Sequence, residues 1–221
     1  MSEEVLIPKM KRLEGKQKRV KIPINNFILV ILCTLLIICA TFVNIDIKHY
    51  IIPQGFSFGK MFASEDFVYS FYIVPQIPIL MFTCSVLGRK LSITCTCLYV
   101  ILGLFAFPFF ALGGGLTYIG EYSFGYILAF ILGVFIAGSF LNKKYSFLNM
   151  ILASILGVLI IHFCGIIYMS LIALIKGDGK IFIQTWISAQ SGLKVVYDII
   201  LSFVGILIGK YVHDFLKFLS D

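Results

Sequence analysis

Four ionisable side chains lie within or beside the long apolar segments of this sequence, and they are the first candidates for chemistry: Glu121, His162, Lys194 and Asp198. Ionisable groups are costly inside a lipid bilayer and often serve a function there. Lys194 and Asp198 are four residues apart, so in a helix they share one face and can pair. Asp198 therefore has two interpretations, a structural ion pair near the outer interface or a polar contact for a ligand.

The other two groups leave similar alternatives open. His162 has no acidic neighbour at helical spacing, which favours a hydrogen-bonded packing residue over a proton relay. Glu121 stands where a helix is expected to begin, so a role in capping that helix competes with ligand contact. The Gly205–Lys210 segment has the wrong spacing for a phosphate-binding loop, and no Ser or Thr follows its lysine. Neither a nucleophile motif nor a zinc motif is present, so we predict no enzyme activity, cofactor or metal.

Composition determines which elements must position these groups. The chain has 221 residues, of which 60% are hydrophobic and 13% charged, and its mean hydropathy is +1.01. A soluble domain of this length could not hide so much apolar surface, which excludes a soluble enzyme, and the same numbers exclude low-complexity disorder. The cysteines all fall in apolar runs and are interpreted as small packing residues rather than disulfides: Cys33, Cys39, Cys84, Cys95, Cys97 and Cys164.

A membrane-spanning helix needs about 20 apolar residues, so stretches without charge define the spans. They predict an all-α, polytopic membrane protein with six transmembrane helices. The expected helices lie near Ile24–Val43, Val68–Leu87, Leu91–Phe107, Tyr122–Leu141, within 145–175, and near Val195–Val212. Residues 1–22 form a basic tail, and residues 23–221 form a single membrane domain.

Lysine and arginine give the orientation. Of the 18 basic residues, thirteen fall in the tail, in the turns at 89–90 and 143–144, and near the chain's end, which predicts cytoplasmic N and C termini. The net charge of +7 is therefore mainly a topology signal, and the predicted partner of the tail is the lipid bilayer rather than nucleic acid. The loops expected outside, 44–67, 108–121 and 175–194, are long and rich in aromatic and amide residues. They suggest a binding site on that face, although interfacial anchoring explains Trp186 equally well.

Small residues recur at four-residue intervals in two predicted helices. One helix carries Gly125, Ala129, Gly133 and Ala137, and the other carries Gly205 and Gly209. Such ribbons let two helices approach closely. They fit internal packing of the bundle, or docking of a partner membrane protein.

An ordered set of motifs over about residues 70–140 resembles the BioY family, the biotin-specific S components of energy-coupling-factor (ECF) vitamin transporters. The set is Pro78-Ile79, Gly88-Arg89, Tyr99 to Gly103, Pro108-Phe-Phe with Gly113-Gly114-Gly115, and Gly125-Tyr126. The resemblance implies six helices in the cell membrane, with vitamin bound from the extracellular face beneath the long loops. It also implies a complex with a transmembrane scaffold subunit and two ATPases.

On this resemblance the expected ligand contacts are Gly113, Gly114, Gly115, Tyr99, Tyr126, Asp198 and Lys194. The glycines would admit close backbone approach, Asp198 would accept from ligand N–H groups, and Lys194 would meet a carboxylate. Two residues depart from the family pattern, because Phe82 replaces a glutamine and Leu201 a lysine. The first helix also lacks the Ala-x-x-x-Ala used against the scaffold. Three functions therefore remain: binding of biotin, binding of another acid such as lipoate, or a non-transport role as an assembly partner.

Overall fold

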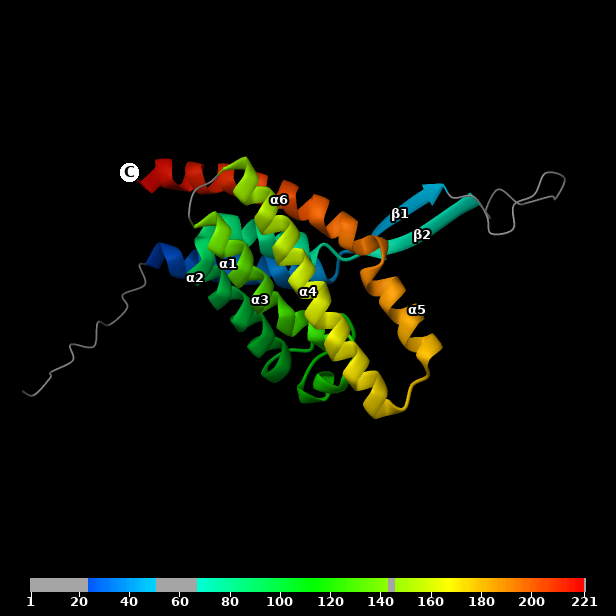
Figure 1. The fold of residues 1–221 in the computed structure, drawn as a ribbon. Coiled ribbons are helices and arrows are strands. Elements are labelled where there is room, and N and C mark those ends of the chain that lie inside the picture. Colours follow the sequence, from blue (N-terminus) through cyan, green and yellow to red (C-terminus); the bar gives the residue numbers. More distant parts are fainter. Residues whose placement is uncertain (1–23, 51–66, 143–145, 221) are drawn as a thin grey trace, which may run out of the picture.

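A computed structural model describes residues 24–50, 67–142 and 146–220 of the chain. The predicted tail 1–22 and the basic pair at 143–144 lie outside the described residues. The elements are, in order, α1 (Ile24–Thr41), β1 (Ile45–Tyr50), β2 (Val68–Ile73), α2 (Gln76–Phe105), the 3-10 helix η2 (Leu116–Gly120), α3 (Phe124–Leu141), α4 (Phe147–Lys176), α5 (Lys180–Ser191) and α6 (Leu193–Ser220). In Figure 1 the start of α1 and the end of α6 lie on one side of the helical bundle, and the strands project from the other side.

Most of the chain is helical, and the apolar helices mark a multi-pass membrane protein. Four helical stretches of the described residues are long and apolar enough to cross a membrane: α2, α3, α4, and the continuous run Lys180–Leu219 that joins α5 to α6. Helix α1 adds a shorter apolar stretch, Asn26–Thr41. The predicted helices at 24–43, 122–141, 145–175 and 195–212 thus correspond to α1, α3, α4 and α6. The count of six spans stays a prediction.

The expectation of an all-α fold is wrong in one place, because β1 and β2 form a two-stranded antiparallel sheet. Ile45 pairs with Ile73 at one end of the sheet and Tyr50 with Val68 at the other. Residues 68–73 were expected to open a helix, but their aromatic and β-branched side chains suit a strand. The helix begins only at Gln76, immediately after Pro75, where prolines fit because the first helical N–H groups have no intrahelical partner.

The second and third predicted helices are two segments of α2, separated by a single residue. Gly88 has φ 73° and ψ 172°, a conformation that strongly favours glycine. Ser92 bridges the break, since its hydroxyl donates to Thr83 O at 3.0 Å and to Gly88 O at 2.8 Å. Arg89 then packs on α3 through Ser139, with 3.1 Å between Nη1 and Oγ. The predicted Gly–basic turn is therefore present, but only as a break within one long element.

Both small-residue ribbons face helices of this chain. A Cβ atom on Gly125 would lie 2.2 Å from Cβ of Tyr168, and one on Gly133 would lie 2.5 Å from the Ile161 side chain, both on α4. A Cβ on Gly209 would lie 2.8 Å from the Phe82 carbonyl oxygen of α2. The remaining ribbon residues, Ala129, Ala137 and Gly205, are buried or half-buried in the same contacts. These contacts agree with internal packing, one of the two roles predicted for the ribbons, and docking of a partner stays a prediction.

Candidate ligand-binding site

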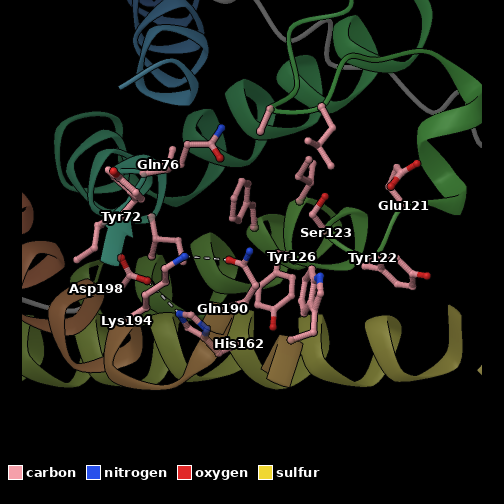
Figure 2. A pocket seen from close by; sticks show the side chains of 18 of the residues that line it. Tyr72, Gln76, Glu121, Tyr122, Ser123, Tyr126, His162, Gln190, Lys194 and Asp198 are labelled. Carbon is pink, nitrogen blue, oxygen red and sulfur yellow. Dashed lines mark hydrogen bonds and ion pairs between the residues drawn. The ribbon is translucent and has the colours of Figure 1, made fainter. Parts of the chain in front are cut away.

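A cavity of about 390 Å³ lies where α2, α3, α4, α5, α6 and the end of the sheet meet. This volume is in the range of small-molecule sites. Its polar wall is formed by Asn44, Gln76, Glu121, Ser123, His162, Gln190, Lys194 and Asp198, and much of the rest is aromatic: Tyr72, Tyr118, Tyr122, Tyr126, Phe130 and Trp186. Figure 2 shows Asp198, Lys194 and Gln76 toward one end and Glu121 and Tyr122 toward the other.

The structure brings together three of the predicted ligand contacts, Tyr126, Lys194 and Asp198, in this cavity. The other four do not line it. Gly113 and Gly115 have positive φ and shape the loop, and Gly114 packs against Pro108. The cavity is instead lined by the two residues just before these glycines, Ala111 and Leu112.

Tyr99, the fourth residue outside the lining, is fully buried. Its hydroxyl oxygen lies 2.9 Å from Nε2 of Gln76, a lining residue. Tyr99 therefore acts on the cavity through Gln76, a residue that the motif analysis did not single out.

Asp198 is held by a residue of a different helix than expected. The distance from His162 Nε2 to Asp198 Oδ2 is 3.1 Å, and both side chains are buried. Lys194 instead donates to Gln190 Oε1 at 3.1 Å, and no ion pair between Lys194 and Asp198 occurs within 4 Å. The acidic partner of His162 is thus 36 residues away along the chain, too far for helical spacing to indicate it.

A chain of hydrogen bonds continues from His162 across the bundle. His162 Nδ1 lies 2.9 Å from Ser191 Oγ, and Ser191 Oγ lies 2.7 Å from the Tyr126 hydroxyl. If His162 donates from Nε2 to the carboxylate, its Nδ1 accepts from Ser191, which in turn accepts from Tyr126. Ser191 is buried and does not line the cavity, so this Ser–His–Asp order presents no nucleophile to a ligand. This series of hydrogen bonds fixes Asp198 relative to α3, α4 and α5.

One oxygen of Asp198 has no partner. Oδ1 is buried and receives no hydrogen bond from any described residue, while Oδ2 is held by His162. A buried acceptor without a donor costs about 1–3 kcal/mol, more when it is charged. Because Asp198 lines the cavity, this oxygen is the group there that most needs a donor from a ligand.

Aromatic rings form the opposite end of the cavity. Trp186 lies 5.9 Å from Tyr126 and 6.1 Å from Tyr122, measured between ring centroids. The Tyr122 hydroxyl donates to Asp178 Oδ2 at 2.7 Å, and this bond to a carboxylate raises the pKa of Tyr122. Tyr118, another residue of the cavity wall, also has a raised pKa, and there the cause is burial. Trp186 thus contributes to the cavity wall and does more than anchor the chain at the interface.

Glu121 lines the cavity but does not cap α3. It follows η2 with an extended backbone, and α3 begins after Ser123 with no acidic residue in its first turn. The capping role predicted for Glu121 is therefore not seen, and ligand contact stays a prediction.

The sheet is fastened to α6 beside Asp198. His49 of β1 stacks on Phe71 of β2, with 5.6 Å between ring centroids, and its Nε2 lies 2.7 Å from the Tyr197 hydroxyl. The Tyr197 ring also packs edge-on against His49 and Phe71, with ring centroids 5.4 and 5.5 Å apart. Because Tyr197 precedes Asp198 in α6, these contacts hold the strands against the helix that carries the carboxylate. Tyr72 and Ile73 at the end of β2 consequently form part of the cavity wall.

Within the part of the chain that the structure describes, no group of three or more His, Cys, Asp or Glu side chains is placed to hold a metal ion. All six cysteines are free, and three of them, Cys33, Cys84 and Cys95, are buried among apolar side chains.

Comparison with known proteins assigns the chain to a family. Residues 14–218 match the sequence profile described as the BioY family. A probable biotin transporter BioY from Lysinibacillus sphaericus is 25% identical over 162 residues, which cover 68% of this chain and 76% of that protein. The biotin transporter BioY of Thermotoga maritima is 33% identical over 93 residues, covering 41% of this chain and 54% of that protein.

The fold also matches a solved structure. The crystal structure of the S-component for biotin from an ECF-type ABC transporter superposes with a TM-score of 0.62 at 22% identity, covering 86% of this chain and 92% of that one. The fold agrees over most of both chains, and the family profile spans nearly all of this one. The chain therefore belongs to the BioY family.

Proposed function

We propose that this chain is the substrate-binding membrane subunit of an ECF-type vitamin transporter and that it binds biotin from the extracellular side. The observation that carries the proposal is the cavity, in which a buried carboxylate oxygen of Asp198 lacks a donor and aromatic rings enclose the remaining space. Biotin offers ureido N–H groups for such an acceptor and apolar ring and chain atoms for the rings. The names of the relatives point to the same substrate.

The acid end of biotin requires a positive group, and Lys194 is proposed for it. Its ammonium is held on Gln190, within the lining of the cavity. A lysine there stands one helical turn before Asp198, whereas the family motif places its lysine after the aspartate, where this chain has Leu201.

The membrane arrangement is part of the same proposal. The excess of Lys and Arg in the tail, in the short turns and near the end of the chain supports six spans in the cell membrane with cytoplasmic termini. The sequence has no phosphate-binding loop, so ATP hydrolysis would come from two ATPase subunits working with a transmembrane scaffold subunit. The cavity then opens toward the outside, beneath the segments that follow α1, α2 and α4.

Lipoate remains the competing ligand, although its support is reduced. The two departures from the family pattern that suggested it, Phe82 and Leu201, do not line the cavity. Phe82 instead packs on α6 near Gly205 and Gly209. The assembly-partner alternative predicted no enclosed polar pocket, and a cavity lined by Tyr126 and Asp198 speaks against it.

The test is a titration of the purified protein with biotin and with lipoate, after mass spectrometry of any small molecule retained through purification. The proposal expects biotin to bind. Absence of biotin binding up to about 100 µM, a free energy of roughly −5.5 kcal/mol, would refute the biotin assignment. Retention of lipoate would select the competing ligand.

A further inference from the structure

Gln76 carries a hydrogen-bond acceptor whose orientation the protein fixes. It is the first residue of α2 and lines the cavity. Its Nε2 donates to Thr41 Oγ1 at 2.6 Å and to the Tyr99 hydroxyl at 2.9 Å. Thr41 and Tyr99 are both buried and do not line the cavity, so they serve the amide rather than a ligand.

The protein uses one side of this amide. The NH₂ group of Gln76 faces Thr41 and Tyr99, and both its hydrogens are used there. The Thr41 hydroxyl donates to Ile37 O at 3.3 Å, which fits its role as an acceptor from Gln76, and it also lies 3.4 Å from the Tyr99 hydroxyl. The amide oxygen is left toward the cavity, as Figure 2 shows, and no described residue donates to it. Gln76 is half-buried at the wall of the cavity, so a ligand in the cavity can reach its amide oxygen.

Gln76 and Asp198 stand on opposite walls toward the same end of the cavity (Figure 2). Each presents an acceptor oxygen that has no protein donor. A ligand head group that fills this end therefore needs two hydrogen-bond donors directed to opposite sides. A cyclic urea has two such N–H groups, whereas a dithiolane ring has none.

We propose that Gln76 is a ligand-contacting residue that selects for a head group with N–H donors, with Thr41 and Tyr99 as its positioning residues. This inference rests on the proposed function and adds to it a specificity-determining contact on α2. A site built to hydrogen-bond a ligand rejects analogues that lack the matching group, because its polar atoms are then left unpaired.

The test uses the full-length protein and measures the Kd of biotin and of two analogues, each methylated on one ureido nitrogen. Gln76→Met removes the acceptor and keeps a side chain of similar length. Gln184→Met is the matched control, because Gln184 is exposed on α5 and outside the cavity. Elution profile and thermal midpoint of each variant verify that it is folded.

We expect Gln76→Met to weaken biotin binding by about tenfold or more, and the Gln184 control to stay within about threefold of the unchanged protein. One methylated analogue should bind the unchanged protein about tenfold more weakly than biotin, yet bind the Gln76→Met variant as well as biotin does. Thr41→Val should reduce the preference for biotin over that analogue while leaving the acceptor residue in place.

Two results would overturn the inference while leaving the proposed function intact. One is biotin binding by Gln76→Met within about twofold of the unchanged protein; the other is an equal loss for biotin and both analogues, which indicates general damage to the cavity. If the unchanged protein itself fails to bind biotin, the proposed function fails and this inference fails with it.

Discussion

Replacing Asp198 with asparagine tests the polarity of the site with almost no change in shape. In the structure Oδ2 lies 3.1 Å from His162 Nε2, and Oδ1 is buried without a donor. If the new amide keeps its oxygen toward His162, its NH₂ group replaces Oδ1. A donor then faces the ligand N–H group, where the carboxylate offered an acceptor. If the amide rotates, it places its NH₂ group against the histidine N–H instead.

The magnitude follows from the bond that is lost. A hydrogen bond to a charged acceptor contributes about 1.5–3 kcal/mol, and every 1.4 kcal/mol is a factor of about ten in Kd. Asp198→Asn should therefore weaken biotin binding by about ten- to a hundredfold. Asp198→Ala should weaken it as much, because it also removes the acceptor and the contact with His162.

Isothermal titration of the purified variants measures the effect. Asp214→Asn is the control, because Asp214 lies on the same helix but is exposed and outside the cavity. The control should bind biotin like the unchanged protein. Biotin affinity of Asp198→Asn within about twofold of the unchanged protein would remove Asp198 from the ligand contacts and refute the reasoning from its free oxygen.

Three further changes probe other parts of the site. Gly209→Ala should lower the thermal midpoint, because the added Cβ would lie 2.8 Å from a backbone oxygen and such overpacking lowers the free energy of unfolding by about 1–3 kcal/mol. Gly120→Ala is the control, since an added Cβ there has no atom within 4 Å and should leave the midpoint unchanged. Equal midpoints for the two variants would argue against close α2–α6 packing. Tyr197→Phe removes the bond to β1, so amide hydrogen exchange in Ile45–Tyr50 should accelerate, and unchanged exchange would show that stacking alone holds the sheet. Lys194→Met should weaken binding of biotin but not of biotin amide, which lacks the carboxylate; an equal effect on both ligands would contradict the proposed charge contact.

The helical spans were largely predictable because a single physical requirement sets them. A segment that crosses hydrocarbon must be long and apolar, and the stretches without charge located α1, α3 and α4 to within a few residues of their observed bounds. The prediction for α6 began near its observed start but ended at Val212, whereas the helix continues to Ser220. The same criterion could not separate the strand Val68–Ile73 from a helix, because both are apolar there. Only the position of Pro75, after which α2 begins, carried a local signal for the boundary.

The site was only partly predictable, because its residues depend on how each helix is rotated about its own axis. Asp198, Lys194 and Tyr126 stood out through charge or motif, and all three line the cavity. Gln76 gave no such signal, and His162 stood out as an ionisable group but was expected to be a packing residue. Their partners, Tyr99 for Gln76 and Asp198 for His162, lie 23 and 36 residues away along the chain.

Contacts between small residues and neighbouring helices fix how each helix is rotated about its axis, which sequence spacing could not predict. Gly165 of α4 packs on the ring of Tyr126, where an added Cβ would lie 2.5 Å from ring atoms. This close approach brings the Tyr126 hydroxyl to Ser191 and, through it, to His162. Small residues therefore have a part in the site, because they bring the helices close enough for Asp198 of α6 to be supported from α3, α4 and α5. Because that support uses only Oδ2, it leaves Oδ1 of Asp198 available to a ligand.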